Sequence, residues 1–377
     1  MNCFIPLVLL ALQDPAPAAA APVQPAQSAP DTGSIAVDLA LCLDTSGSMD
    51  GLIEAAKTKL WAIVNDLALA RPAPRLRVAL LTYGNSGHDA AAGWVQVQTP
   101  FTEDLDLVSQ KLFQLRTNGG TELVGRVVRA SLEQLEWNAS PEALKLILVA
   151  GNESADQDQE VPFRDACRRA IECGIQVNSI YCGGAADPDA EGWKEVARRA
   201  DGHYGNIDQN AVLVIATPFD EGLAALSAAL NATYVPYGTT GATAWANQAQ
   251  QDANAATLNS TAAAERAACK ANGLYQCGWD LVDACRGGRM QLEDVKTSEL
   301  PENLRNLSRE ELAAHLDQQW RRRSELHVQI QERSRERDQF VQAELAKAAL
   351  RGDQAFDTAI RAAIRSQAQA KGFLFPQ

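Results

Sequence analysis

The 377-residue sequence lacks the short motifs that carry common enzyme chemistries. It has no Gly-x-x-x-x-Gly-Lys phosphate loop, no Gly-x-Ser-x-Gly nucleophile elbow and no His-Glu-x-x-His zinc motif. It has only four histidines, and no motif places one of them beside a serine. We therefore expect a protein that is not an enzyme.

Basic residues are outnumbered by acidic ones. The chain has 34 Lys and Arg against 47 Asp and Glu, which gives a formal net charge of -13. Nucleic-acid binding needs clustered Lys and Arg that neutralise phosphates. This balance argues against a nucleic-acid partner.

No Lys or Arg precedes Lys57, so the apolar run at residues 3–12 lacks the basic flank of an export signal. Its length and the alanine-rich stretch that follows still predict a signal peptide over residues 1–22 and an exported protein, periplasmic or extracellular. The run is too short to span a bilayer, so we do not expect an integral membrane protein. Residues 23–33 are rich in Ala, Pro and Gln and predict an extended linker.

No two cysteines are spaced as Cys-x-x-Cys, which argues against a zinc ribbon or a thioredoxin-like site. Removal of a signal peptide would take Cys3 away and leave an odd number of cysteines. Cys269, Cys277 and Cys285 are evenly spaced along the chain. In an exported protein, a disulfide between Cys277 and either of the other two is an open alternative to free thiols.

From residue 34 onward, apolar strands alternate with amphipathic helices. A first strand runs from Ile35 to Asp44, and a helix is expected at 51–70. Further strands are expected at 76–83, 94–97, 144–149, 175–181 and 203–207, and further helices at 104–115, 122–137, 162–172, 189–199 and 209–230. This order predicts an α/β fold over residues 34–230. We expect a doubly wound, mostly parallel sheet flanked by helices, with a ligand site at the carboxyl ends of its strands.

After residue 230 the composition and the periodicity of the sequence change. Residues 231–305 are rich in Gly, Ala, Thr, Asn and Gln with little periodicity, and we expect an irregular linking region. Residues 306–377 predict a mainly α-helical C-terminal region. Its charged stretch 308–350 is expected to be a long surface helix packed against the domain. A self-associating coiled coil is the alternative, although Arg323, Ser334 and Arg337 interrupt its seam.

The segment Asp44-Thr45-Ser46-Gly47-Ser48-Met49 lies between the first strand and the first helix. Its Asp-x-Ser-x-Ser spacing places one carboxylate and two hydroxyls on one tight loop. Such hard oxygen ligands suit Mg²⁺, Mn²⁺ or Ca²⁺. A second loop, Asn118-Gly119-Gly120-Thr121, can bring the Thr121 hydroxyl to the same ion.

These two loops and the apolar strand Leu146-Ile147-Leu148-Val149 resemble the von Willebrand factor type A family over roughly residues 34–225. The likeness extends to little-studied exported bacterial proteins with a helical tail. It implies a metal-ion-dependent adhesion site with Asp44, Ser46, Ser48 and Thr121 as ligands, directly or through water. It also implies that a protein partner presents a carboxylate to the ion. The rim residues that would contact this partner are Met49, Asp50, Tyr83, Gly84, Asn85 and Asn118.

One departure from the family follows the strand at 144–149. The family has Thr-Asp-Gly there, and its Asp completes the site, whereas this chain has Val149-Ala150-Gly151-Asn152-Glu153. Asn152 or Glu153 is expected to substitute for the missing Asp from one or two positions further on. The alternative is a metal site that is only vestigial.

The sequence therefore predicts an extracytoplasmic binding protein. It would use a partial metal-ion-dependent adhesion site and a divalent cation (Mg²⁺, Mn²⁺ or Ca²⁺) for protein–protein interaction. The alternative is a structural or scaffold protein with a vestigial metal site, which self-associates through residues 308–350.

Overall fold

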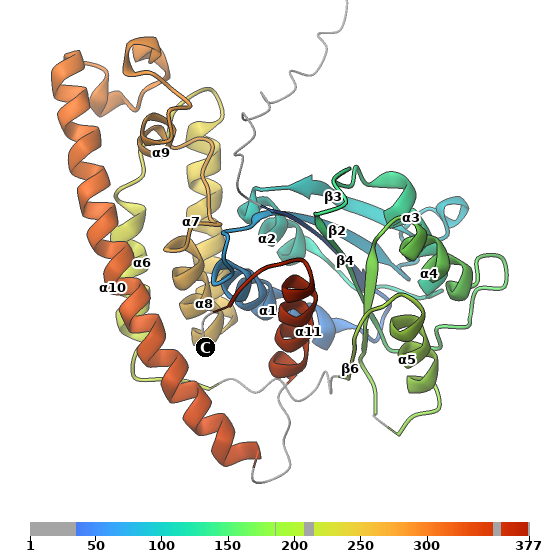
Figure 1. The fold of residues 1–377 in the computed structure, drawn as a ribbon. Coiled ribbons are helices and arrows are strands. Elements are labelled where there is room, and N and C mark those ends of the chain that lie inside the picture. The colour runs from blue at the N-terminus through green and yellow to red at the C-terminus, as the bar shows by residue number, and fades with distance from the viewer. Residues whose placement is uncertain (1–34, 185, 207–214, 350–355, 376–377) are drawn as a thin grey trace, which may run out of the picture. The chain divides into compact units, whose positions relative to one another are not determined.

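The computed structural model describes residues 35–184, 186–206, 215–349 and 356–375. A six-stranded sheet has the strand order β3-β2-β1-β4-β5-β6 (Figure 1). The strands are β1 (Ala36–Asp44), β2 (Arg75–Tyr83), β3 (Gln96–Thr102), β4 (Leu144–Gly151), β5 (Gln176–Tyr181) and β6 (Tyr204–Asn206). All pair in parallel except β3, which is antiparallel to β2. The predicted doubly wound, mostly parallel sheet is confirmed.

Two hydrophobic cores cover the two faces of this sheet. Successive residues of β1 alternate between them, with Leu39 and Leu41 in one core and Ala40 and Cys42 in the other. The first core includes α1 (Asp50–Ala68) and α2 (Leu105–Gln114). The second includes α3 (Val124–Gln134), α4 (Phe163–Glu172) and α5 (Ala190–Arg199). A sheet buried on both faces explains why its central strands are almost wholly apolar.

Most elements of this region lie within two residues of their predicted bounds. Three differences matter. The helix expected at 209–230 begins only at Asp220, and the described residues before it, 215–219, are not helical. The edge strand expected at 94–97 lies at Gln96–Thr102, after a short 3₁₀ turn at Ala90–Ala92. The helix expected from Glu122 begins at Val124, so Glu122 belongs to the preceding loop. The predicted signal peptide and linker, residues 1–33, lie outside the described residues, as does Ile207.

The expectation of an irregular region at 231–305 was wrong. After α6 (Asp220–Asn231), it contains α7 (Gly241–Leu258), α8 (Ser260–Lys270) and α9 (Leu281–Arg286). Three 3₁₀ turns follow at Leu292–Asp294, Thr297–Glu299 and Glu302–Leu304. Helix α7 could not be predicted from apolar periodicity, because its buried face is polar. Gln248 and Gln251 are fully buried, and they are hydrogen-bonded to Tyr275 (3.0 Å) and Ser109 (3.0 Å) respectively.

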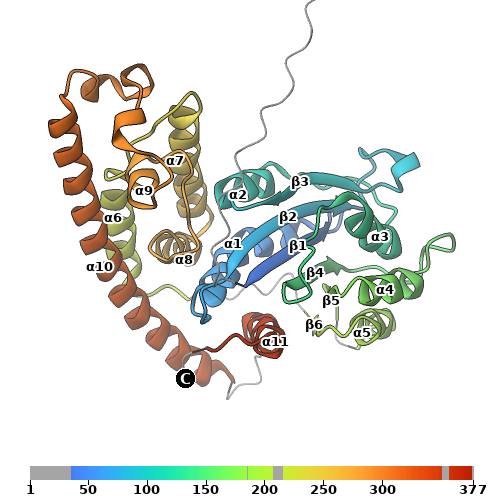
Figure 2. The same ribbon diagram turned by 45° about the horizontal axis from the view of Figure 1, so that its top comes forward.

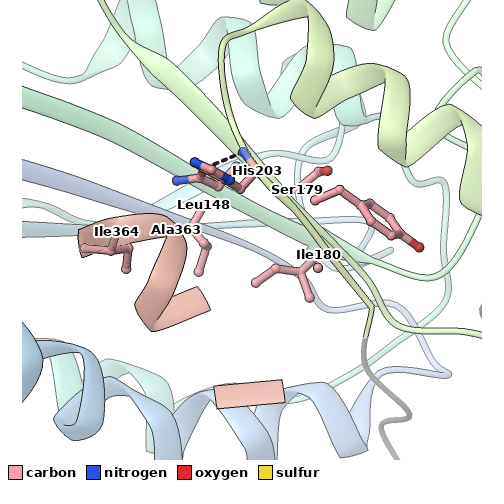
Figure 3. A pocket seen from close by; sticks show the side chains of 9 residues that line it. Leu148, Ser179, Ile180, His203, Ala363 and Ile364 are labelled. Carbon is pink, nitrogen blue, oxygen red and sulfur yellow. Dashed lines mark hydrogen bonds between the residues drawn. The ribbon is translucent and has the colours of Figure 1, made fainter. Parts of the chain in front are cut away.

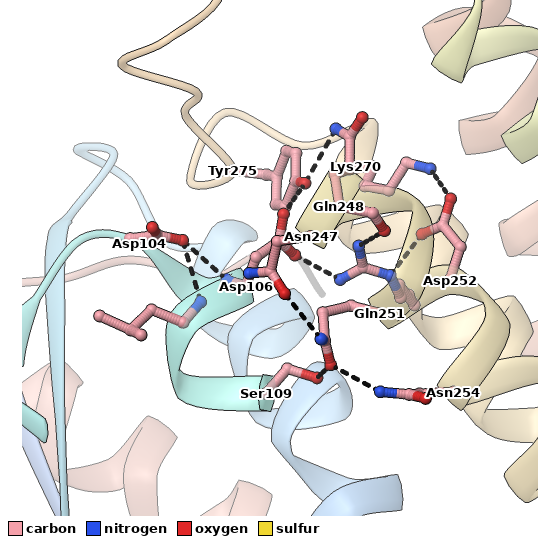
Figure 4. Close-up of polar contacts among 12 residues, drawn as sticks. Asp104, Asp106, Ser109, Asn247, Gln248, Gln251, Asp252, Asn254, Lys270 and Tyr275 are labelled. Atoms are coloured by element: carbon pink, nitrogen blue, oxygen red, sulfur yellow. Dashed lines mark hydrogen bonds and ion pairs between the residues drawn. The ribbon is translucent and has the colours of Figure 1, made fainter. Parts of the chain in front are cut away.

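A buried charge network joins these helices to the sheet region (Figure 4). Arg266 of α8 binds Asp106 of α2 at 2.7 Å and Asp252 of α7 at 2.5 Å. Lys270 binds the same Asp252 at 2.7 Å. Both cations are only 1% exposed. Buried charges persist only when paired and hydrogen-bonded, so this network indicates that the helices pack against the sheet region in one defined arrangement.

The long helix α10 (Arg309–Ala349) packs along α6, α8 and α9 (Figures 1 and 2). One stripe of it is buried and comprises Leu312, Leu316, Arg323, Leu326, Ile330 and Arg337. The two arginines that interrupt the apolar pattern lie inside this stripe. Arg323 binds Asp280 and Asp283, and Arg337 binds Asp220 and Glu265. The stripe is thus covered within the chain, as expected for a surface helix packed against the domain.

The cysteines at 42, 167, 173, 182, 269, 277 and 285 are all free in the described part of the chain. The disulfides left open for Cys277 are therefore not formed in this structure. Within the described ranges, no helix is both long and apolar enough to cross a membrane.

The last helix, α11 (Phe356–Ala370), packs near the β5–β6 edge of the sheet. Buried Gln367 and buried Asn178 of β5 exchange two hydrogen bonds of 3.0 and 2.9 Å. A cavity of about 10 Å³ lies where α11 meets β5 and is lined by Ser179, Ile180, His203 and Ala363, among others (Figure 3). That volume suits about one water molecule, so this cavity is not a ligand site.

Replacing Gln367 by leucine should lower the free energy of unfolding by about 1–3 kcal/mol, because the buried Asn178 amide loses its acceptor. Urea denaturation measures the loss. Gln369→Leu is the matched control, since Gln369 lies on the same helix but is exposed, and it should change stability by less than about 0.5 kcal/mol. Equal effects from the two variants would contradict this role for Gln367.

Candidate metal site

The predicted metal loop follows β1 and lies between β1 and β4, where the strand order of the sheet reverses. Ligands of open α/β sheets bind at this position, outside the carboxyl ends of the strands. Asp44 is the last residue of β1 and is fully buried. Its Oδ1 accepts a hydrogen bond from the backbone amide of Ser46 at 2.7 Å, which holds the carboxyl group over the loop.

Backbone hydrogen bonds tie the second predicted loop to the first. The amide of Gly47 donates to the carbonyl of Gly119 at 2.6 Å, and the amide of Asn118 donates to the carbonyl of Thr45 at 3.0 Å. A third loop, after β2, joins them because the amide of Ser86 donates to the carbonyl of Asn118 at 3.0 Å. The segments around residues 45, 86 and 119 therefore form one continuous rim.

Several buried oxygens at this rim have no hydrogen-bond partner. They are Asp44 Oδ2, Ser46 Oγ, Glu122 Oε2 and Asn152 Oδ1. Buried polar atoms are rarely left unsatisfied, and a cluster of them indicates a ligand or ion. All four are oxygens, as the hard cations Mg²⁺, Mn²⁺ and Ca²⁺ require. The residues present thus fit a divalent cation.

A family model for the von Willebrand factor type A domain matches residues 38–214. The chain contains a von Willebrand factor type A (VWA) domain. The family model and the observed strand order agree with the resemblance of the Asp-x-Ser-x-Ser and Gly-Gly-Thr loops. No curated protein matches the chain.

Several solved structures are similar to part of the chain. The SpRpn10 VWA domain is 16% identical with a TM-score of 0.36, over 45% of this chain and 87% of that one. Proximal thread matrix protein 1 of the mussel byssus, solved with a zinc-occupied MIDAS motif, is 13% identical with a TM-score of 0.38, over 48% of this chain and 44% of that one. The vWF domain of the pili tip protein Mfa5 from Porphyromonas gingivalis is 13% identical with a TM-score of 0.37, over 48% and 92%. These TM-scores are low, so the assignment rests on the family model.

The predicted metal ligands of the VWA domain differ in burial and in hydrogen bonding. Asp44 and Ser46 are buried at the centre of the site, whereas Ser48 is exposed and its Oγ accepts a hydrogen bond from Asn152 Nδ2 at 3.0 Å. Thr121 is half-buried on the loop that carries Gly119. Glu153 is exposed, and its carboxylate accepts a hydrogen bond from Gln157 at 3.2 Å.

Sequence reasoning missed Glu122, which follows Thr121 directly. Its side chain is only 6% exposed, and its Oε2 has no partner. An acidic residue at the start of an expected helix is favoured by the helix dipole, so its position alone does not mark it as a metal ligand. A signal was available, because an acidic residue beside a predicted ligand is itself a candidate ligand.

The electrostatics of the site are those of two carboxyl groups in a dry environment. Burial, and after it the charge of Glu122, raises the pKa of Asp44 to about 8. Burial also raises the pKa of Glu122. Without a cation, the site therefore resists the ionisation of both groups, and a divalent ion would remove that cost.

The rim that faces solvent differs from the predicted one. Met49, Tyr83, Gly84 and Asn85 are buried, so they cannot contact a partner as expected. Met49 belongs to the hydrophobic core, and the Tyr83 hydroxyl donates to the carbonyl of Ala150 at 3.0 Å. The residues that do reach solvent around the site include Gly47, Ser48, Asp50, Asn118 and Gly120.

Across the described ranges, no group of three or more His, Cys, Asp or Glu side chains is arranged to hold a metal ion. Two carboxyl groups, Asp44 and Glu122, lie at this site, and its other unpartnered buried oxygens belong to a hydroxyl and an amide. A soft metal that prefers thiolate or imidazole ligands does not suit this donor set.

Proposed function

We propose that this VWA domain is a non-catalytic binding module, which uses a divalent cation at Asp44 for protein–protein interaction outside the cytoplasm. The observation that carries the proposal is the cluster of buried, unpartnered oxygens around Asp44 and Ser46. Asp44 and Ser46 would hold the ion, with Ser48 and Thr121 contributing directly or through water. The preferred ion is Mg²⁺, Mn²⁺ or Ca²⁺.

A bound divalent ion would supply an open coordination position that attracts an anionic group of a partner, even though the chain itself is acidic. A carboxylate is therefore the expected recognition group. Gly47, Ser48 and Asp50 are exposed beside the ion position and leave it accessible. Location outside the cytoplasm rests on the export-like sequence of residues 1–22.

The alternative, a scaffold that self-associates through 308–350 with a vestigial metal site, finds less support. The stripe of α10 that a coiled coil would use is buried against α6, α8 and α9. No specific observation favours it over the metal-dependent module.

Calorimetric titration of Mg²⁺, Mn²⁺ and Ca²⁺ into the full chain tests the proposal. We expect at least one ion to bind with a dissociation constant below about 1 mM, as extracellular calcium modules do. Asp44→Ala combined with Ser46→Ala should abolish the binding heat, because it removes both buried ligands.

Asp50→Ala is the matched control, since Asp50 is an exposed acid on the same segment that accepts a hydrogen bond from Thr117 instead. It should bind the ion like the wild type. If the wild-type chain bound none of the three ions at millimolar concentration, the site would be vestigial.

A further inference from the structure

The site has one carboxylate from the predicted loop, and the structure places a second beside it that comes from another part of the chain. Glu122 lies in the loop before α3, and its Oε2 is buried without a partner, like Asp44 Oδ2 and Ser46 Oγ. These three atoms come from two loops that backbone hydrogen bonds hold together. Their common lack of a partner indicates that they share one missing ligand.

Two glycines leave the space in which Glu122 reaches the loop. A Cβ atom on Gly84 would lie 2.6 Å from Asp44 Oδ1 and 3.0 Å from Glu122 Cγ. A Cβ atom on Gly120 would lie 2.7 Å from Ser46 Cβ and 2.9 Å from Glu122 Oε1. Gly84 also has a φ of 75°, which favours glycine. Any larger residue at either position would push the Glu122 carboxylate away from Asp44 and Ser46.

The end of β4 offers no room for an acidic side chain. A Cβ atom on Gly151 would lie 2.5 Å from the Tyr83 hydroxyl and 3.1 Å from the Trp193 ring. Both aromatic side chains are almost fully buried, so neither can easily move. The Tyr83 hydroxyl is further held by its hydrogen bond to Ala150. An acid at position 151 is therefore excluded by packing.

The two residues that follow Gly151 do not supply the second carboxylate. Asn152 is neutral, and its amide group donates to Ser48. Glu153 is exposed and is bonded to Gln157. Among the described acidic residues of this site, Glu122 joins Asp44 in combining burial with an unpartnered carboxylate oxygen.

We propose that Glu122 is the second carboxylate ligand of the Asp44 cation site and replaces the acid that cannot fit at position 151. This inference rests on the proposed function, because it assumes that the site binds a cation. Two carboxylates balance the charge of one divalent ion inside a buried site. The ion would also link the loop before α3 to the loop after β1.

Mn²⁺ titration of the full chain and of E122Q tests this assignment. E122Q should lower the affinity for Mn²⁺ by at least about 10-fold, because a neutral amide of the same shape replaces a charged ligand. E153Q is the matched control and should bind Mn²⁺ within about twofold of the wild type. It removes an equal charge close to the site but no buried oxygen.

Thermal unfolding in the presence of a chelator separates a ligand from a structural residue. Without metal, E122Q should be at least as stable as the wild type at pH 8, because one of two neighbouring buried carboxylates is gone. Added Mn²⁺ should raise the unfolding temperature of the wild type more than that of E122Q. A structural Glu122 would instead make the metal-free variant less stable.

Three results would overturn the assignment. E122Q could bind Mn²⁺ like the wild type while Asp44→Ala does not, in which case the site works without Glu122. E153Q could lose affinity in place of E122Q, which would make Glu153 the second carboxylate. Failure of the wild type to bind would overturn the proposed function and this inference together.

Discussion

Replacing Arg323 by methionine should lower the free energy of unfolding by about 3–5 kcal/mol. Arg323 is 1% exposed on α10 and binds buried Asp280 at 2.7 Å and Asp283 at 2.6 Å. It also donates to the carbonyl of Thr233 at 2.7 Å and lies 4.2 Å from the centre of the Tyr234 ring. Methionine fills part of the volume but leaves the Asp280 carboxylate buried without its cation.

Urea denaturation of the full chain measures this effect. Arg333→Met is the matched control, because Arg333 lies on the same helix, is exposed and pairs with exposed Glu336 one turn away. Surface pairs of this kind contribute little, so the control should stay within about 0.5 kcal/mol of the wild type. A loss below about 1 kcal/mol for Arg323→Met would show that α10 is held by its apolar contacts alone.

In the metal-free protein, the free energy of unfolding should fall by about 2 kcal/mol as the pH rises from 6.5 to 8. The cause is Asp44, whose pKa burial and the Glu122 charge raise to about 8. An unfolded chain ionises this group near pH 4. Between these two values the folded protein holds a proton that the unfolded chain has released, so each added pH unit disfavours folding by up to about 1.4 kcal/mol.

Below pH 6.5, His327 changes the free energy of unfolding with pH in the direction opposite to Asp44. Burial and the nearby Arg323 lower the pKa of His327 to about 4, whereas an unfolded histidine titrates near 6.5. Its contribution to stability is present above pH 6.5 and is lost as the pH falls towards 4. Between pH 4 and 6.5 the two groups nearly cancel, and the decline caused by Asp44 becomes visible only above that range.

Chemical denaturation at a series of pH values, with a chelator present, tests this profile. Asp44→Asn should remove most of the decline above pH 6.5, because the group no longer titrates. A saturating divalent cation should also remove it in the wild type, since the ion favours the ionised carboxylates. A decline of the same size in Asp44→Asn would assign it to other groups and contradict a raised pKa at Asp44.

The two kinds of buried residue in α10 show where sequence reasoning succeeds and fails. Leu312, Leu326 and Ile330 follow the helical period, so the helix and its apolar stripe could be predicted. In the sequence, Arg323 and Arg337 interrupt the apolar pattern of this helix. A pattern of apolar residues does not show which carboxylates of other helices will pair with them. Their partners are as much as 117 residues away along the chain.

Helix α7 illustrates the same limit in another way. Its alanines have high helix propensity, but its buried face carries Gln248 and Gln251 in place of leucines. A search for amphipathic periodicity therefore finds nothing, although the helix is well packed. The hydrogen bonds that make those glutamines suitable for burial, to Tyr275 and Ser109, come from distant segments.

The sequence by itself determined the succession of strands and helices along residues 34–230 and the class of the sheet. It also determined the Asp44-Thr45-Ser46-Gly47-Ser48 loop. These features follow from local periodicity and from residue spacing within a single turn. Only the tertiary structure decided that Glu122 lies beside Asp44, that Tyr83 occupies the space next to Gly151, and that Met49 is buried. The physical reason is that a side chain's burial and its unpartnered atoms depend on which distant loops fold against it, and spacing along one segment does not contain that information.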